Sequence, residues 1–306
     1  MRSLGRGAIV KRAILAFLAL ALFASSPALP QIPGHSFGLS NVDPYILNNL
    51  TPHGNPNDLT NTAGRTMVSP VLGVGQRTIV LLVWGQSNSE CAATGSLFTP
   101  AHPTVVQNLS VDNGAVYQAV EPLLGCGVGG GAWSTQLADA LITDNYADRV
   151  IIETIGVGGT KSADWAAGGY LNHRIGVAAR RYLAMGISPT RLFGLTHQGE
   201  DDCAAGTSQS AYATTKASEI ATWRAIISGL IVFIAQASYQ LGTTCSAITA
   251  AQAGLVDNVT TFSLGNFDVI PAGNRIGSPG TDYNGAGMTQ AAGIAKAQIE
   301  AYLNTH

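Results

Sequence analysis

Short apolar runs alternate with longer helix-like segments from residue 78 to the end of the chain. The first run, Thr78–Val83, is rich in β-branched residues and is typical of a strand that is buried on both faces of a parallel sheet. We expect strands at 78–84, 149–155, 191–196, 229–236 and 258–263, and helices at 132–144, 172–185, 208–227, 247–255 and 286–303. This alternation predicts an α/β fold, with a parallel sheet of about five strands between two layers of helices.

The segments that carry most of the reactive side chains follow successive predicted strands. Trp84–Glu90 follows the first strand, Gly156–Thr160 the second and His197–Asp202 the third. Right-handed crossovers bring the carboxyl ends of parallel strands to one edge of the sheet, and open α/β sheets bind their ligands at that edge. We therefore expect the three segments to meet around one site.

Ser87 is a candidate nucleophile because it leaves a buried strand on a turn that contains glycine. A serine hydrolase also needs a base, a group that orients the base, and donors for the oxyanion. The backbone N–H groups of Ser87 and Gly159 and the side-chain amide of Gln198 are candidate donors. The alternatives remain open: Ser87 as a helix cap, the glycine segment as an ordinary turn, and the acidic run that begins at Glu200 as a helix start.

Three further side chains near these segments are candidate substrate contacts. Gln86 and Asn88 flank the serine, and Trp165 follows the glycine segment. An aromatic ring stacks well on a sugar, but packing in the protein interior is an equally good interpretation of Trp165. Asn88 has the alternative role of a helix N-cap.

The three segments resemble the SGNH hydrolase superfamily, and within it the sialate O-acetylesterase-like carbohydrate esterases, which include acetylxylan esterases. The matching blocks are Gly85-Gln86-Ser87-Asn88, then Gly158-Gly159-Thr160 with Trp165, then Gln198-Gly199-Glu200 followed by Asp201. The resemblance implies a three-layer α/β/α, flavodoxin-like fold. It also implies that an acetyl group is removed from a carbohydrate through an acyl-enzyme on Ser87. In that scheme Ser87, Gly159 and Gln198 stabilise the oxyanion, and Glu200 helps to orient the base.

The chain departs from this family where the catalytic histidine is expected. Aligned on Asn284-Gly-Ala-Gly287, that histidine is replaced by Asp282, and no histidine lies between His197 and His306. Asp282 is one candidate base, although a carboxylate with an ordinary pKa near 4 is a weak base at neutral pH.

Two further hypotheses account for the missing histidine. His197, which is nearest by motif, or His173 takes over as the base; the loops that carry His35, His53 and His102 have no predicted position. Alternatively, catalysis has been lost and a carbohydrate-binding cleft remains, since a fold does not guarantee a function. An esterase or acyl transferase that acts on esters other than sugars is also a hypothesis.

The first residues of the chain are typical of a secretory signal. A basic stretch precedes the apolar segment Ala13–Ala24, and small residues follow it. We expect a signal peptide at 1–28, an irregular extension at 29–77 and one hydrolase domain at 78–306, in a secreted or periplasmic protein. A retained N-terminal anchor is the alternative.

The four cysteines of the chain are expected to form disulfides. An even number of cysteines in an exported chain favours two disulfides. Of the three pairings we favour Cys91–Cys126 and Cys203–Cys245, although spacing does not settle the connectivity.

The net charge of −2 predicts no nucleic-acid partner, and no later apolar run is long enough to predict a membrane partner. No spacing predicts a metal or another cofactor, so the expected partner is an acetylated carbohydrate or another small ester.

Overall fold

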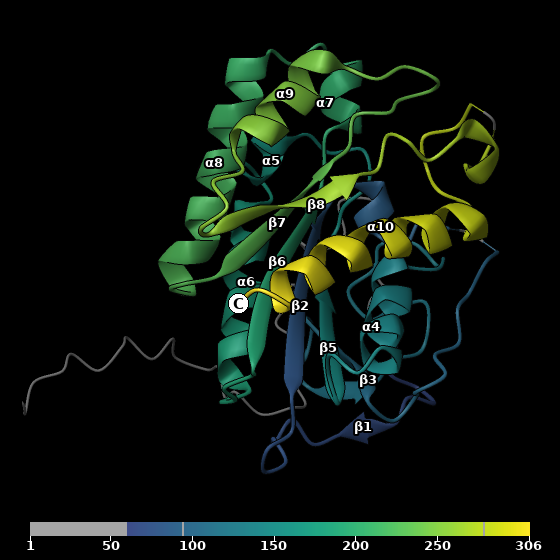
Figure 1. Ribbon diagram of the computed structural model, residues 1–306, viewed down its shortest axis with the longest axis vertical. Coiled ribbons are helices and arrows are strands. Elements are labelled where there is room, and N and C mark those ends of the chain that lie inside the picture. Colours follow the sequence, from purple (N-terminus) through teal and green to yellow (C-terminus); the bar gives the residue numbers. More distant parts are fainter. Residues whose placement is uncertain (1–59, 94, 278) are drawn as a thin grey trace, which may run out of the picture. The chain divides into compact units, whose positions relative to one another are not determined.

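The predicted apolar runs form the centre of the sheet. The computed structural model describes residues 60–306 except residues 94 and 278. Five parallel strands lie side by side close to their predicted bounds, in the order β5 (Arg149–Thr154), β2 (Thr78–Gly85), β6 (Arg191–His197), β7 (Ile231–Gln236) and β8 (Thr261–Asn266) (Figure 1). The α/β fold class is confirmed.

The sheet has eight strands in the described part of the chain, and not about five as predicted. β3 (Val106–Leu109) pairs with β5 in parallel, and β4 (Val116–Gln118) and β1 (Met67–Val68) continue that edge in antiparallel orientation. These strands are short, and β3 contains the polar pair Gln107-Asn108 in place of an apolar run. The Asn108 amide is buried and donates to the carbonyl oxygens of Leu124 and Ile152, so a polar side chain fills a core position.

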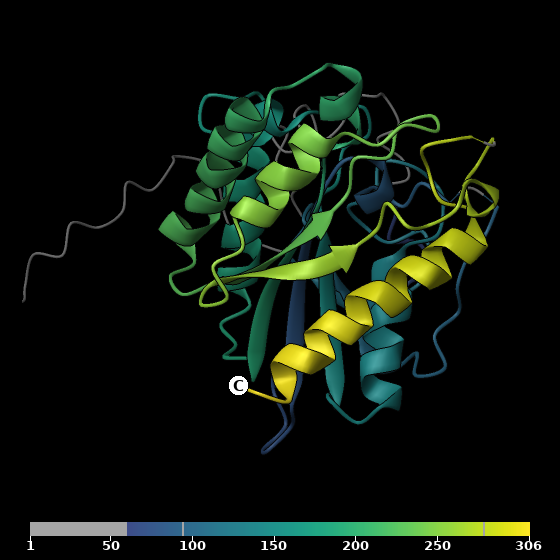
Figure 2. The same cartoon turned by 45° about the horizontal axis from the view of Figure 1, so that its top comes forward.

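Helices cover both faces of the sheet and give the three predicted layers. One face carries α4 (Trp133–Thr143) and α10 (Gly285–Leu303); the other carries α6 (Asn172–Ala184), α8 (Gln209–Ile226) and α9 (Ser246–Gly254) (Figures 1 and 2). Two short helices follow β5 and β6. The sequence did not predict α5 (Ser162–Trp165), whereas α7 (Glu200–Ala204) begins at Glu200, where the acidic run was given the alternative interpretation of a helix start.

The core lies on the two faces of the sheet, and β2 contributes to both. All eight residues of β2 are buried. Ile79, Leu81 and Val83 pack on the side of α4 and α10, whereas the residues between them pack on the side of α6 and α8. Burial of each such side chain stabilises the fold by about 1.5–3 kcal/mol relative to exposure. An uninterrupted apolar run is therefore needed here, because neither face of the strand meets water.

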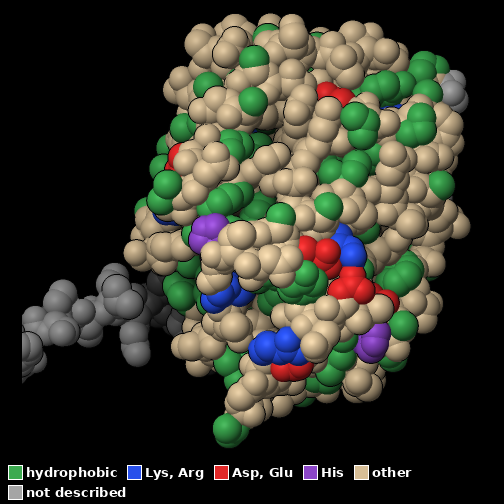
Figure 3. Space-filling view, viewed as in Figure 1, with side chains coloured by type: hydrophobic (Ala, Val, Ile, Leu, Met, Phe, Trp, Pro, Cys, Tyr) green, Lys and Arg blue, Asp and Glu red, His purple; other side chains and the backbone are tan. Residues whose placement is uncertain are grey.

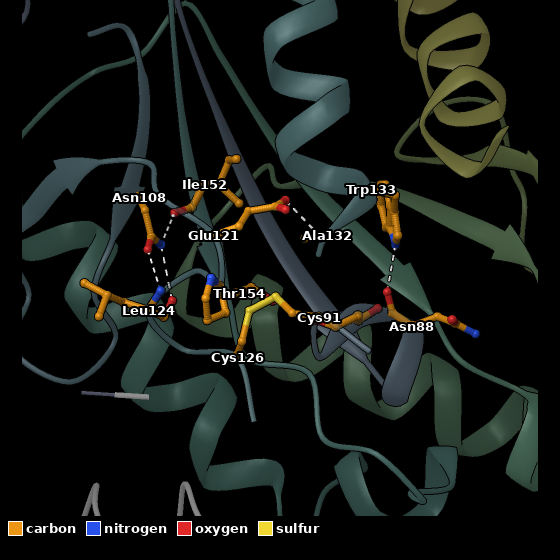
Figure 4. The surroundings of a disulfide bond; sticks show 12 residues. Asn88, Cys91, Asn108, Glu121, Leu124, Cys126, Ala132, Trp133, Ile152 and Thr154 are labelled. Atoms are coloured by element: carbon orange, nitrogen blue, oxygen red, sulfur yellow. Dashed lines mark hydrogen bonds between the residues drawn. A yellow bond between two sulfur atoms is a disulfide. The ribbon is translucent and has the colours of Figure 1, made fainter. Parts of the chain in front are cut away.

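Both disulfides have the predicted pairing, Cys91–Cys126 and Cys203–Cys245. Figure 4 shows the first, which joins the turn after β2 to the loop that leads into α4. The second joins α7 to the residue before α9. Each one thus ties together two segments at the carboxyl edge of the sheet.

Part of the predicted organisation lies outside the described residues, namely the signal at 1–28 and residues 29–59 of the extension. Within the described remainder of the extension, β1 belongs to the sheet. None of the described helices combines the length and the apolar character that crossing a membrane requires.

Candidate active site

The turn after β2 brings Ser87 to the wall of a cavity. Gly85 has φ +135°, and a Cβ atom there would lie 1.9 Å from the carbonyl oxygen of His197, so only glycine fits. The N–H of Gln86 donates to the same carbonyl at 3.1 Å. A short 3₁₀ turn, Ser87–Ser89, follows, and the partly exposed Ser87 faces a cavity of about 450 Å³.

Ser87 contacts the residue that stands in place of the expected histidine. Its Oγ donates a hydrogen bond to Oδ1 of Asp282, and the two oxygen atoms are 2.5 Å apart. Asp282 lies in the loop before α10, and its carbonyl oxygen accepts a hydrogen bond of 2.7 Å from the N–H of Ile276. Both side chains line the cavity. The fold therefore joins two residues that are 195 positions apart in the sequence.

None of the four described histidines presents its side chain to Ser87. Neither His102, His173, His197 nor His306 lines the cavity, and none of them hydrogen-bonds to Ser87. His35 and His53 lie outside the described residues. Among the residues that the structure describes, Asp282 is thus the group in contact with the serine hydroxyl.

His197 is a core residue, and the structure does not support it as the base. It is fully buried; its Nε2 lies 2.9 Å from the hydroxyl of Tyr283. Its Nδ1 lies 3.3 Å from Oε1 of Glu200, too poorly aligned for a hydrogen bond. Burial, assisted by the positive charge of Arg275, lowers the pKa of His197 to about 3. The ring is therefore neutral at physiological pH and faces the protein interior.

Asn88 connects the serine turn to the Asp282 loop. Its Nδ2 donates a hydrogen bond of 3.0 Å to Oε1 of Glu200. Its Oδ1 accepts a hydrogen bond of 3.0 Å from the backbone N–H of Tyr283. Its backbone oxygen accepts a hydrogen bond from the indole of Trp133 (Figure 4). Because Asn88 is buried, it is placed to position the residue next to Asp282 and not to contact substrate as the sequence suggested.

Glu200 acts on the site through Asn88. Burial raises the pKa of the Glu200 carboxyl to about 8, so this group is protonated at neutral pH. Its Oε1 accepts from Asn88, and no hydrogen bond joins it to Asp282. The expected role of Glu200 in orienting the base is therefore indirect, by way of Asn88 and the backbone of Tyr283.

Two backbone donors are open beside the serine. The N–H groups of Ser87 and Gly159 have no hydrogen-bond acceptor among residues 60–306 as described. Gly159 has φ +69° and is exposed, and a Cβ atom on Gly158 would lie 3.5 Å from the Cβ of Ser87. The glycine loop therefore packs against the nucleophile and supplies an N–H group without an acceptor next to it, the kind of donor that an oxyanion requires.

Gln198 and Trp165 do not line the cavity. The Gln198 amide is buried, and its Nε2 donates to the carbonyl oxygen of Thr160, to Oδ2 of Asp202 at 3.2 Å and to Oε1 of Gln86 at 3.3 Å. It thus supports a residue of the cavity wall and makes no hydrogen bond to Ser87. Trp165 is buried in the core on the α6 side, and its Nε1 donates to Thr160 Oγ1 over 3.1 Å. Neither side chain is a contact for a substrate in this cavity.

Two carboxylates of the cavity wall were missed by the sequence reasoning. Glu90 and Asp201 both line it. The Glu90 carboxylate accepts the N–H of Gly158, and Glu90 belongs to the first of the three segments, which was the available signal. Gln86 also lines the cavity, and its Oε1 accepts the N–H of Asp201 over 3.0 Å. Among the described residues, no three His, Cys, Asp or Glu side chains are grouped so as to hold a metal ion.

Known proteins resemble this chain in structure and not in sequence. No protein family and no curated protein matches it by sequence. A protein of solved structure from Arabidopsis thaliana is 19% identical, with a TM-score of 0.57 over 75% of this chain and 99% of its own. A carbohydrate acetylesterase from Xanthomonas citri is 13% identical, with a TM-score of 0.49 over 74% of this chain and 56% of its own. A family 3 carbohydrate esterase from Clostridium thermocellum is 13% identical, with a TM-score of 0.45 over 74% and 98%.

These similarities bear on the fold alone. The α/β architecture is shared with the plant protein over nearly all of that chain. At such low identity a shared fold does not carry a shared reaction, so the reaction has to be argued from the residues of the cavity.

Proposed function

We propose that this protein is a serine ester hydrolase of the SGNH type that removes acyl groups, in particular acetyl groups on a carbohydrate. The observation that carries the proposal is the 2.5 Å hydrogen bond from Ser87 to Asp282 on the wall of the cavity. The open N–H groups of Ser87 and Gly159 lie beside it. The three sequence blocks support the family, and the architecture is compatible with it.

The proposed reaction uses Asp282 as the proton carrier. Ser87 Oγ attacks the ester carbonyl carbon while its proton passes to Asp282 Oδ1. The oxyanion is held by the N–H groups of Ser87 and Gly159. The tetrahedral intermediate collapses, the alcohol oxygen leaves with the proton from Asp282, and the acyl group stays on Ser87. Water then repeats the sequence and releases the acid.

A serine–carboxylate pair is expected to be slower than a serine–histidine pair. The ordinary pKa of an aspartate is about 3.9 and that of a histidine about 6.5, so a carboxylate takes the serine proton less readily. We therefore expect measurable turnover of activated esters and slower turnover of sugar acetates, whose leaving groups are poorer.

A second candidate is a carbohydrate-binding protein that has lost catalysis. The observation that favours it is that no described histidine reaches Ser87. Such a protein would keep the cavity and the fold, and its Ser87 would be a polar wall residue.

Hydrolysis of p-nitrophenyl acetate and of acetylated xylan separates the two candidates. We expect Ser87→Ala to lower the rate on the order of 10³-fold or more, and Asp282→Asn, which keeps the shape but not the basic oxygen, to lower it strongly as well. Asp282→His places an imidazole at the aligned position, and we expect it to raise kcat above that of Asp282→Asn. Equal rates of acetate release by wild type and Ser87→Ala would refute the esterase.

We also propose that the protein is exported. The basic and apolar pattern of residues 1–28 supports this, and two disulfides suit an oxidising compartment. Fractionation of cells that express the full chain, with mass spectrometry of the mature N-terminus, tests this proposal.

A further inference from the structure

The walls of the cavity carry one sign of charge. Glu90, Asp201 and Asp282 line it, and they come from three separate segments of the chain. No Lys or Arg occurs among the described residues that line it. Charged residues make up only 11% of the sequence, and Figure 3 shows a face on which they are sparse. Three carboxylates on one cavity are therefore a strong local feature.

The nearest cations offset this charge only in part. Lys161 is near enough to Asp201 to favour its ionised form, but it lies outside the cavity wall. Burial and the neighbouring charges of Asp202 and Asp282 act in the opposite direction and raise the pKa of Asp201. Arg174 is buried and interacts with Glu90. The field inside the cavity is thus expected to be negative when these carboxyls are ionised.

A second feature of the cavity indicates the kind of group that it accepts. Gln86 is fully buried and lines the cavity, and its Nε2 has no hydrogen-bond acceptor among the described residues. The oxygen and nitrogen of this amide are distinguished by the hydrogen bond that Oε1 accepts from the backbone N–H of Asp201. This Nε2 is itself enclosed in the wall, so the neutral donors that the cavity presents to carbonyl or hydroxyl oxygens are the N–H groups of Ser87 and Gly159. Nothing in the described wall offers the cationic partner that a carboxylate or phosphate needs.

We propose that the cavity selects esters whose alcohol part is uncharged or positively charged, and rejects esters that carry a carboxylate or phosphate near the acyl group. Asp201 is the specificity-determining residue, since Asp282 binds Ser87 and Glu90 binds Gly158. The inference rests on the proposed esterase function and narrows its substrates. Acetates of neutral or amino-bearing alcohols are favoured over acetates of acidic sugars.

Three aryl acetates with one ring and different charges test this preference. They are phenyl acetate, 3-acetoxybenzoate and 3-acetoxy-N,N,N-trimethylanilinium. One unit charge on a wall carboxylate changes the affinity for a charge roughly 8 Å away by about fivefold at a partly solvated site. We divide kcat/KM for each charged ester by kcat/KM for phenyl acetate. We expect Asp201→Asn to raise this ratio about fivefold for 3-acetoxybenzoate and to lower it about fivefold for the trimethylanilinium ester. Ratios within one variant cancel a general loss of activity.

The matched control is Asp148→Asn. Asp148 is an exposed carboxylate that pairs with Arg77 just before β5, at the opposite edge of the sheet, so its loss should leave both ratios as in wild type. High salt should shrink the effect of Asp201→Asn, since it screens charges. Ratios that do not move in Asp201→Asn, or that move equally in Asp148→Asn, would overturn the inference while the esterase stands.

Binding without turnover separates this inference from the proposed function. In Ser87→Ala, the trimethylanilinium ester should bind more tightly than the benzoate ester in an NMR titration. Adding Asp201→Asn should reduce the ratio of the two affinities about 25-fold, because each ester changes about fivefold in opposite directions. If wild type hydrolyses none of the esters but this binding pattern holds, the esterase is refuted and the charge preference stands. If neither hydrolysis nor selective binding is found, both are refuted.

Discussion

Replacement of Asn88 by alanine tests whether one buried amide holds the proposed site together. The change removes two 3.0 Å hydrogen bonds, one donated to Glu200 and one accepted from the N–H of Tyr283. The Tyr283 N–H is left buried without a partner, at a cost of about 1–3 kcal/mol, and the bond to the Glu200 carboxyl adds about 1 kcal/mol. We expect the free energy of unfolding to fall by about 3 kcal/mol and Tm by roughly 10 °C.

Asn88→Ala should also reduce activity, because Tyr283 is the neighbour of Asp282. A loop that shifts by about 1 Å misplaces the carboxylate with respect to Ser87, and we expect kcat/KM to fall between about 10-fold and 100-fold. Urea unfolding and p-nitrophenyl acetate hydrolysis measure the two effects.

The control is Asn108→Ala, which removes a comparable buried amide from β3. Asn108 donates to backbone carbonyls and accepts the N–H of Leu124, away from the cavity lining. It should lower stability to a similar extent and leave kcat/KM unchanged. A fully active Asn88→Ala protein, or a loss of stability below about 1 kcal/mol, would refute the reasoning.

Two further predictions concern stability. Burial raises the pKa of Glu200 from 4.5 to about 8, so between these pH values the folded protein keeps a proton that the unfolded chain has released, and this group lowers stability as pH rises. Glu200→Gln removes that titration, and urea unfolding at pH 5 and pH 8 should show a shallower fall than in wild type; an identical fall would contradict the shift. Loss of the Cys203–Cys245 bridge, which spans 42 residues, should cost about 4 kcal/mol. Thermal unfolding of Cys203→Ser/Cys245→Ser measures it, and a Tm equal to that of wild type would contradict it.

Sequence reasoning located the central strands because a parallel strand that is buried on both faces needs an uninterrupted run of apolar residues. It missed β3 and β4 because they are short, and because Asn108 satisfies its amide against backbone atoms from distant segments. A polar side chain can occupy the core only when such partners are present. Local sequence cannot reveal partners that are supplied by other parts of the fold.

The same limit applied at the site. Ser87, Gly159 and Asp282 could be proposed from motifs, since a turn after a strand and a glycine loop leave local marks. Where the side chains of Asn88, Gln198 and Trp165 point depends on hydrogen-bond partners from other elements, such as Tyr283 and Thr160.

The amino-acid sequence by itself determined the alternation of strands and helices, the edge of the sheet where reactive residues follow the strands, and the absence of a histidine at the aligned position. These properties follow from local patterning and composition. Only the tertiary structure decided that Asp282 meets Ser87 and that Glu90 and Asp201 share its cavity. It also decided that His197 is neutral and buried. The reason is that distances, burial and the electrostatic field at a site are set by segments that are remote in the chain.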